Sequence, residues 1–357
     1  MVVAVAAVFG ANAHYPYQSK ILEEQVMSGL LRNQKTLVAR LAMFVALLAL
    51  ITSLGACNKQ ENTGSEKASQ KTFASPEDAG AALLDAARSG DQATLHAIFG
   101  PDTKEVLFSG DPVKDKDAFQ DFVTRYTQMH RWHQIKAGGQ MLSAGADNWV
   151  FPIPLGQNPS GQWYFDTAAG RDEILARRVG KGELTAMVAC TAIAQAEDEY
   201  FSQTHDGDKV KQYAQKLISD EGKRNGLYYP VAAGQTPSPL EYVRDFAKAA
   251  GYTNAGDKPQ PFDGYYFRIL TKQGDKAEGG AKNYIANGKM TGGFAVVAYP
   301  AEYRNSGIMT FIVAKDGVVY QKDLGEKTTD EGASMTDYNP GDGWSPVVSP
   351  PEPERRL

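Results

Sequence analysis

Several short patterns carry residue types that could do chemistry, and each lacks part of what that chemistry needs. His130 and His133 are three residues apart at the end of an expected helix, where two imidazoles could hold a metal ion. The spacing supplies no third ligand, and Arg131 adds an unfavourable charge between them. We therefore expect no metal site, and a surface or hydrogen-bonded pair is the simpler interpretation.

Two other patterns match ion-binding or phosphate-binding loops only in part. Asp206 and Asp208 place two carboxylates in one loop, but the later Asp/Asn, Gly and Glu of a calcium loop are missing. Lys289 follows Gly288, but Met290 stands where a phosphate loop needs Ser or Thr. The sequence therefore predicts no bound cofactor.

Neither of two candidate nucleophiles has the surroundings that it needs. Ser345 is followed by Pro346, which breaks the pattern of a nucleophile elbow. Cys190 shares a helical stripe with Met187 and Ile193, which indicates a small buried hydrophobe. We expect no catalytic residue and no enzyme, with a hydrolase kept as the lesser alternative.

The pattern with the most complete chemistry is Leu54-Gly55-Ala56-Cys57, at the end of an apolar run from Leu41 to Ser53. That run is shorter than the ~20 apolar residues that cross a bilayer. A basic segment precedes it, formed by Arg32, Lys35 and Arg40. The arrangement resembles a bacterial lipoprotein signal, which implies cleavage between Ala56 and Cys57 and thioether attachment of a diacylglycerol to Cys57.

This resemblance implies an exported protein, held on a bacterial membrane by acyl chains that each contribute ~0.8 kcal/mol per buried methylene. Asn58 follows Cys57 where Asp commonly signals inner-membrane retention, so we expect the outer membrane, facing the periplasm. A signal begins near its basic segment, so Met27 is the expected true start and residues 1–26 an extension. Of the 357 residues, the 56 before Cys57 would be lost and 301 would remain.

Composition indicates a globular body. Hydrophobic residues make up 42% and charged residues 22% of the chain, which suits a packed domain. A net charge of -5 without a dense Lys/Arg cluster argues against nucleic acid as a partner. With Cys57 lipidated, Cys190 has no cysteine left for an intrachain disulfide.

The chain divides into five expected segments. Between Asn58 and Thr72 it lacks aromatic side chains and aliphatic ones larger than alanine, which predicts a flexible tether. Extended at ~3.3 Å per residue, this tether would reach roughly 50 Å. The predicted segments are a signal region (1–56), the lipidated cysteine and tether (57–74), an α+β cone-like domain (75–170), a second α+β domain (171–325) and a Gly/Pro-rich tail (326–357).

Both domains are predicted to combine helices with antiparallel strands, so the fold class is α+β. In the first domain, capping and apolar spacing predict three helices, at 75–90, 94–99 and 117–129. A hairpin is predicted at 148–166. In the second, helices are expected within 171–219, including 183–200 and 209–217, and over 238–251. Four strands are expected to form an antiparallel meander, at 265–270, 294–299, 308–313 and 318–321, with a two-residue turn at Asp316-Gly317.

The chain resembles three known groups of proteins. Helices followed by a terminal Trp-Tyr-Phe strand resemble the cone-shaped nuclear-transport-factor-2-like domains. The blocks beginning at Trp163, Asn225 and Gly293 resemble the signatures of the bacterial family called domain of unknown function 2950, over about 73–325. That family implies an identity and no mechanism.

The second half is also similar to the globular heads of type IV pilins and pseudopilins. The likeness rests on Ala196 to Tyr200, on the Gly-Leu-Tyr-Tyr-Pro element at Gly226, and on a strand before an Asp-Gly turn. Pilins continue an apolar helix into the head, whereas here the apolar run ends at a lipobox and a polar tether. We therefore expect a single anchored head and no polymer.

Two functions remain open. The first is a non-enzymatic cell-envelope lipoprotein that presents an interaction surface to another envelope protein or to wall polymer, with an exposed aromatic patch around Tyr228, Tyr229 and Tyr299. The alternative is a periplasmic small-ligand-binding lipoprotein that uses the cavity of the first domain, lined by Trp149 and Trp163. The membrane, reached through the lipid, is a partner in both.

Overall fold

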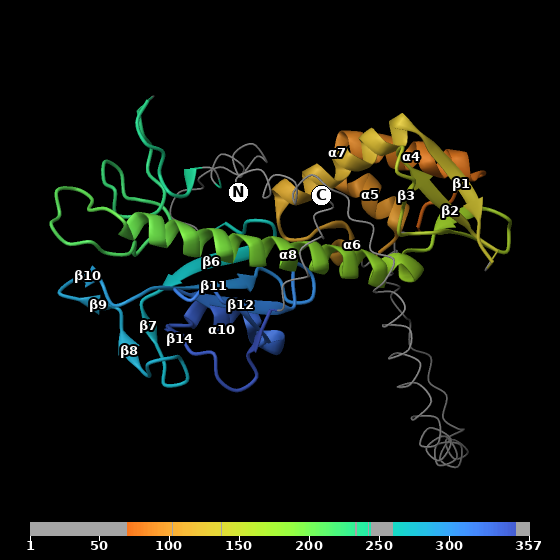
Figure 1. The fold of residues 1–357 in the computed structure, drawn as a ribbon. Helices are drawn as coiled ribbons and strands as arrows, with labels where there is room; N and C mark the ends of the chain where they lie inside the picture. The colour runs from red at the N-terminus through yellow and green to blue at the C-terminus, as the bar shows by residue number, and fades with distance from the viewer. Residues whose placement is uncertain are drawn as a thin grey trace, which may run out of the picture. The chain divides into compact units, whose positions relative to one another are not determined.

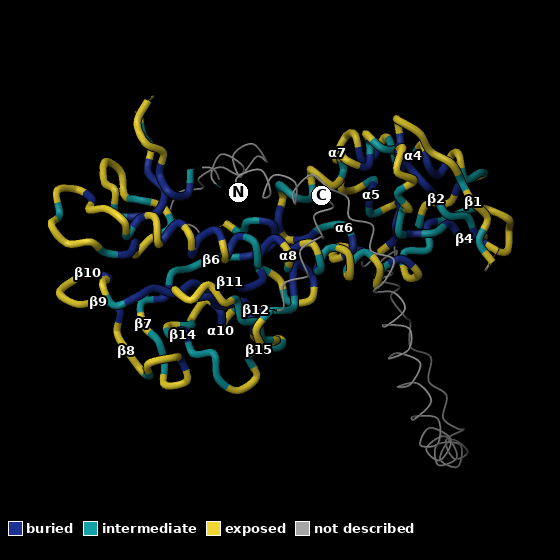
Figure 2. Tube along the Cα trace, in the orientation of Figure 1, coloured by how far each residue is buried: buried dark blue, intermediate teal, exposed yellow. Residues whose placement is uncertain are grey.

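Two hydrophobic clusters organise the folded chain (Figure 1). The computed structural model describes residues 70–101, 103–136, 138–232, 234–241, 243 and 260–347, all within one compact unit, 66–357. The first cluster draws its buried residues from 73–165 and the second from 186–338, and buried segments fill both (Figure 2). The fold is α+β, as predicted. The predicted signal, Cys57 and residues 58–69 of the tether lie outside the described residues.

Helices form one side of the first cluster. Helix α4 begins as predicted, because Ser75 caps it by accepting a hydrogen bond from Asp78 N (3.1 Å). It ends at Gly90, whose φ of 65° suits glycine. The helices of this region are α4 (Pro76–Ser89), α5 (Gln92–Phe99), α6 (Lys104–Leu107) and α7 (Pro112–Gln128).

Helix α7 begins five residues before the predicted start at Asp117. Asp111 is its cap, since Asp111 Oδ1 accepts hydrogen bonds from Val113 N (3.0 Å) and Lys114 N (3.2 Å). Pro112 occupies the first turn, where its missing N–H costs nothing. The earlier start matters, because it puts Lys114 and Asp115 on the helix.

An antiparallel sheet covers the other side of this cluster, in the order β1-β2-β4-β5 with β3 beside β2. The predicted hairpin is wrong in one arm: Trp149–Val150 pairs with β2, and Leu155–Gln157 pairs with Trp163–Phe165. Pro152 and Pro154 separate the two short strands, because neither can donate a ladder hydrogen bond. The strands are β1 (His130–Gln134), β2 (Gln140–Ala144), β3 (Trp149–Val150), β4 (Leu155–Gln157) and β5 (Trp163–Phe165).

One 35-residue helix, α8 (Thr167–Phe201), runs from the first cluster into the second (Figure 1). Asp166 caps it by accepting from Ala169 N at 3.1 Å. The predicted helix over 209–217 is wrong. In that segment Tyr213 N donates to Met290 O (2.8 Å) and Ala214 N to Glu197 Oε2 (2.8 Å), so its backbone groups bond to distant partners instead of to a helical turn.

The second cluster contains the predicted antiparallel meander, extended by one strand to the order β15-β13-β12-β11-β6. Strand β11 is buried along its whole length, because α8 contacts it from one side and α10 from the other (Figure 1). The predicted two-residue turn is wrong, since five residues, 315–319, join β12 to β13. The strands are β6 (Tyr265–Leu270), β11 (Ala295–Pro300), β12 (Met309–Ala314), β13 (Tyr320–Asp323) and β15 (Ser345–Pro346).

Short elements complete the second cluster, and several of them lie where a tail was predicted. They are β7 (Lys272–Gln273), β8 (Lys282–Asn283), β9 (Ile285–Ala286), β10 (Lys289–Met290), η2 (Gly325–Lys327), α10 (Thr328–Ser334) and β14 (Asp337–Tyr338). Residues 326–347 therefore contribute structure, including α10 against β11. The predicted helix over 238–251 lies largely outside the described residues, although Ser238 Oγ donates to Glu241 Oε2 (3.0 Å) at its start.

Within the described ranges, no helix combines the length and the apolar character that crossing a membrane requires.

Candidate functional site

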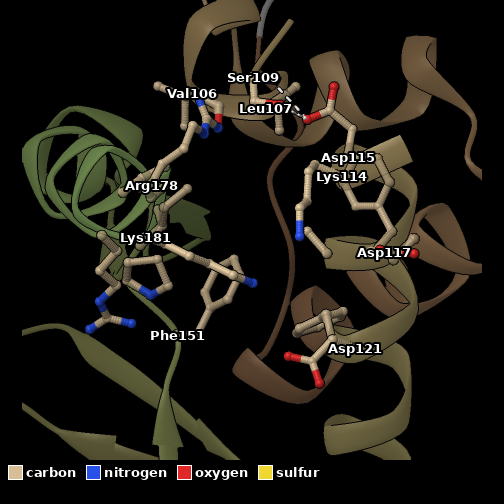
Figure 3. A pocket seen from close by; sticks show the side chains of 18 of the residues that line it. Val106, Leu107, Ser109, Lys114, Asp115, Asp117, Asp121, Phe151, Arg178 and Lys181 are labelled. Carbon is tan, nitrogen blue, oxygen red and sulfur yellow. Dashed lines mark hydrogen bonds between the residues drawn. The ribbon is translucent and has the colours of Figure 1, made fainter. Parts of the chain in front are cut away.

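A cavity of about 460 Å³ lies between α7 and α8 (Figure 3). Its lining combines an apolar floor with charged side chains, and it takes residues from α4 to α8, from the β3–β4 segment and from the two loops around residues 263 and 306. The apolar floor is formed mainly by Leu83, Leu95, Phe99, Phe122, Phe151 and Ile153.

Aromatic packing holds the floor in place. The ring of Phe151 lies 5.5 Å from that of Phe122 on α7, 6.4 Å from that of Phe99 on α5 and 6.0 Å from that of Phe165, centroid to centroid. Trp149 also lines the cavity and meets Phe151 edge to face at 6.0 Å. These contacts fix the floor from three different elements, so its shape is largely preformed.

The charged lining is divided between two helices. Helix α8 contributes Arg177, Arg178 and Lys181, and Lys181 lies beside both arginines on the helix surface because it follows them by four and three residues. Helix α7 contributes Lys114 and three carboxylates, from Asp115, Asp117 and Asp121. One wall is therefore cationic and the other mainly anionic.

Arg178 is a fixed part of the α8 wall. Its guanidinium donates to the carbonyl oxygens of Glu105 (2.6 Å), Val106 (2.7 Å) and Phe108 (3.2 Å), and also to Asn305 Oδ1. Burial lowers the pKa of Arg178, an effect that the nearby Asp115 and Glu302 charges only partly oppose. The residue thus ties α6 and the loop before β12 to α8.

Lys114 lines the cavity and is paired with a carboxylate from the second cluster's side. Its ammonium lies 3.0 Å from Asp263 Oδ1, and the side chains are 21% and 9% exposed. Asp111, the cap of α7, accepts from Gly264 N at 3.3 Å beside this pair. These contacts join α7 to the segment that enters β6.

Asp115 is engaged by the loop before α7. Its Oδ1 accepts from Ser109 N (2.9 Å) and Ser109 Oγ (2.7 Å). Burial raises the pKa of the Asp115 carboxyl, more than these hydrogen bonds and the Arg178 charge lower it. Asp115 therefore orders the 103–111 loop and does not offer a free charge to a ligand.

Lys181 differs from its charged neighbours. Figure 3 shows its side chain reaching into the space between α8 and α7. Arg177, one turn away, bonds Glu173 Oε1 (2.6 Å) and Val150 O (2.9 Å). Lys181 has no hydrogen-bond or ion-pair partner within the described part of the chain.

The residues proposed for an exposed aromatic patch are not exposed. Tyr228, Tyr229 and Tyr299 are 7%, 4% and 5% exposed and belong to the second cluster. Trp149 and Trp163 are half-buried against the first cluster, and of these two only Trp149 lines the cavity. The expected surface around the three tyrosines is therefore wrong, because each packs its ring into the core.

The metal candidates do not assemble into a site. His130 and His133 lie on strand β1, not on a helix end, and three residues along a strand put side chains on opposite faces. His130 Nδ1 is 2.9 Å from Tyr126 O. Asp208 bonds Lys289, which lowers the pKa of Asp208. Among the residues that the structure describes, no three His, Cys, Asp or Glu side chains are grouped to hold a metal.

The candidate nucleophiles are likewise engaged elsewhere. Cys190 is fully buried, and burial raises the pKa of its thiol to about 12. Ser345 lies in β15. His96 Nδ1 is 3.2 Å from Thr103 Oγ1, yet that hydroxyl already donates to Gly100 O (2.8 Å), so the imidazole has no proton to accept from it.

Sequence reasoning did not single out the charged side chains of the cavity. The i, i+1, i+4 spacing of Arg177, Arg178 and Lys181 on a predicted helix was an available signal for a cationic face. Nothing local marks Asp263 or Asn305 as their neighbours, because those contacts join residues 127 or more positions apart.

Comparison with known proteins supports one of the expected resemblances. Residues 70–347 match the family described as "Protein of unknown function (DUF2950)". No curated protein and no solved structure matches the chain, so the likeness to pilin heads and to nuclear-transport-factor-2-like domains stays an expectation. The match covers most of the chain, and the protein therefore belongs to the DUF2950 family.

Proposed function

We propose that this protein is a lipid-anchored, non-enzymatic protein of the bacterial envelope that binds a small ligand in the cavity between α7 and α8. The observation that carries the proposal is the cavity itself: about 460 Å³, with an aromatic and aliphatic floor and a few charged groups above it. Ligand pockets typically measure about 300–1,000 Å³ and have this kind of lining.

The structure favours a cavity over an aromatic interaction surface. The three tyrosines expected to form such a surface are buried in the second cluster. The cavity, by contrast, includes the aromatic Trp149 that the ligand-binding alternative requires. An envelope protein or wall polymer therefore becomes the lesser candidate partner.

Binding, and not catalysis, is the activity that we propose for this site. Most titratable groups on the cavity wall are fixed by structural bonds, as Asp115 is by Ser109 and Arg178 by three carbonyls. A catalytic site needs a base within hydrogen-bond reach of a nucleophile or substrate proton. No histidine lines the cavity, judged over the ranges that the structure describes.

The anchor is part of the same proposal and rests on the sequence. Cleavage before Cys57 and acylation of its sulfur would tether the folded unit to the membrane, with the cavity in the periplasm. Mass spectrometry of the mature protein is expected to show a diacylglycerol-modified cysteine as the first residue. An unmodified Cys57 with the preceding residues still attached would refute the anchor without touching the cavity.

Ligand binding can be tested with the uncharged fluorescent probe N-phenyl-1-naphthylamine. The full chain would carry Cys57→Ser, so that no acyl chain offers the probe another apolar site. Ala118 on α7 lines the cavity, and Ala118→Trp would fill space there. Thr124→Trp adds the same indole to an exposed position of the same helix that does not line the cavity.

We expect the fluorescence of the probe to rise to saturation as it binds. Ala118→Trp should lower the affinity for the probe at least fivefold, and Thr124→Trp should leave this affinity unchanged. Any binding to the apolar run before Cys57 is common to all three proteins and cancels in the comparison. Equal enhancement in all three would refute the cavity as the binding site.

A further inference from the structure

We propose that the ligand is an anionic amphiphile, a molecule with an apolar body and one carboxylate, and that Lys181 receives its carboxylate. This inference rests on the proposed ligand-binding function and adds the chemical class of the ligand. The ligand class follows from the charged groups of the cavity wall that have no partner among the residues that the structure describes.

Most charged groups of the lining have partners within the protein. Lys114 is paired with Asp263 at 3.0 Å, and Asp121 accepts from Arg125 Nε at 2.8 Å. Asp115 is held by Ser109, as described above. These groups shape the cavity, and an incoming ligand would have to break an existing bond to use them.

The α8 wall also contains compensated cations. Arg177 forms an ion pair with Glu173. Arg178 donates hydrogen bonds to three backbone carbonyl oxygens and to Asn305. Lys181 is the cation of this wall that keeps its donors available, within the described residues. Its side chain reaches over the space beside Phe151 (Figure 3). An ammonium at the edge of an apolar floor recognises an anionic group joined to an apolar body.

The two walls would also orient such a ligand. Asp117 on helix α7 has no hydrogen-bond or ion-pair partner among the described residues and would repel an anion, whereas Lys181 on α8 would attract one. The carboxylate of the ligand is therefore expected against α8 and its apolar body against the floor. An ammonium-bearing ligand would instead seek Asp117, and this possibility forms one arm of the test.

Three probes with the same apolar chain separate these cases: decanoate and decylammonium, used below their micellar concentrations, and decan-1-ol, used below its solubility limit. They would compete with N-phenyl-1-naphthylamine on the full chain carrying Cys57→Ser. We expect decanoate to bind about five to ten times more tightly than decan-1-ol, and decylammonium to bind no more tightly than decan-1-ol. Added salt should weaken decanoate and leave decan-1-ol unchanged.

Variants of one residue assign the effect to Lys181. Lys181→Met keeps a long apolar stem and removes the charge, so decanoate should weaken to the level of decan-1-ol. Lys181→Arg should retain most of the preference. Lys209→Met makes the same change in net charge at an exposed lysine that does not line the cavity, and it should have no effect.

The outcomes distinguish the two proposals. If decan-1-ol and decanoate compete equally, or if Lys181→Met leaves decanoate unchanged, the anionic ligand class is refuted while the cavity remains a binding site. Tighter binding of decylammonium would also refute it and would favour a cationic ligand. If none of the probes competes and Ala118→Trp has no effect, the proposed function itself fails.

Discussion

Lys114 and Asp263 form an ion pair, with 3.0 Å between Nζ and Oδ1, that joins helix α7 of the first hydrophobic cluster to the segment entering β6 of the second. The carboxylate is 9% exposed and the lysine side chain 21% exposed. Both residues line the cavity. A contact between residues 149 positions apart thus helps to hold the two clusters together and shapes the proposed binding site.

Replacing Lys114 should therefore destabilise the protein. Lys114→Met removes the ammonium that lies 3.0 Å from the buried Asp263 carboxylate, which is expected to lower the free energy of unfolding by about 1–3 kcal/mol. Urea denaturation of the full chain measures this change. Lys116→Met, at an exposed position of the same helix, is the control, and an equal loss in both variants would argue against the ion pair.

Two glycines of α8 should respond in opposite ways to the same substitution. A Cβ at Gly182 would lie 2.5 Å from Ser306 O, a backbone atom, whereas one at Gly180 would meet nothing within 4 Å. Gly182→Ala should cost about 1–3 kcal/mol by forcing α8 away from that loop. Gly180→Ala should stabilise by about 0.5–1 kcal/mol, because alanine favours the helix.

The two glycine variants would be compared by thermal and urea denaturation of otherwise identical chains. If both stabilised the protein, the close approach of α8 to the 306 loop would be wrong. If both destabilised it, the open space beside Gly180 would be wrong.

Arg178 should matter more for stability than its neighbour. Arg178→Met removes the donor from three carbonyl oxygens and from Asn305, and the expected cost is about 2–4 kcal/mol. Arg178→Lys should recover only part of it, because an ammonium cannot span the same acceptors. Arg177→Met, an exposed position, serves as the control. Similar losses at both positions would contradict a specific role for Arg178.

Glu197 should make stability depend on pH. Its side chain is fully buried, Oε2 accepts from Ala214 N at 2.8 Å, and Oε1 has no hydrogen-bond partner among the described residues. Burial raises the pKa of Glu197 well above its ordinary value of 4.5, so the folded state favours the protonated form. The contribution of Glu197 to the free energy of unfolding is therefore fully present below pH 4.5. It is lost as the pH rises through the folded-state pKa.

Glu197→Gln keeps an acceptor for Ala214 N and cannot ionise. It should stabilise the protein by about 1–3 kcal/mol at pH 8 and by progressively less as the pH falls to 4.5. Urea denaturation at a series of pH values measures this difference. Glu199→Gln, at an exposed position of the same helix, should show no such trend. A pH-independent difference would contradict the raised pKa.

Local patterns determined a good part of the secondary structure. The cap at Ser75, the four strands of the second sheet and the small-hydrophobe role of Cys190 were all predicted, because each depends on neighbours within a few residues or on a simple apolar period. The errors fall where distant partners decide. The 209–217 segment has helical spacing, yet its N–H groups bond Met290 O and Glu197 Oε2.

The same division applies to function. By itself the sequence indicated the family, the absence of a recognisable catalytic motif, and a lipid anchor at Cys57, since such signals are read from contiguous residues. Only the tertiary structure showed that Tyr228, Tyr229 and Tyr299 are buried and that α7 and α8 enclose a cavity with a cationic wall. Aromatic side chains suit a core and a surface equally well, so their burial is decided by which elements pack against them. Charged side chains form a site only when folding brings them to facing walls of one cavity.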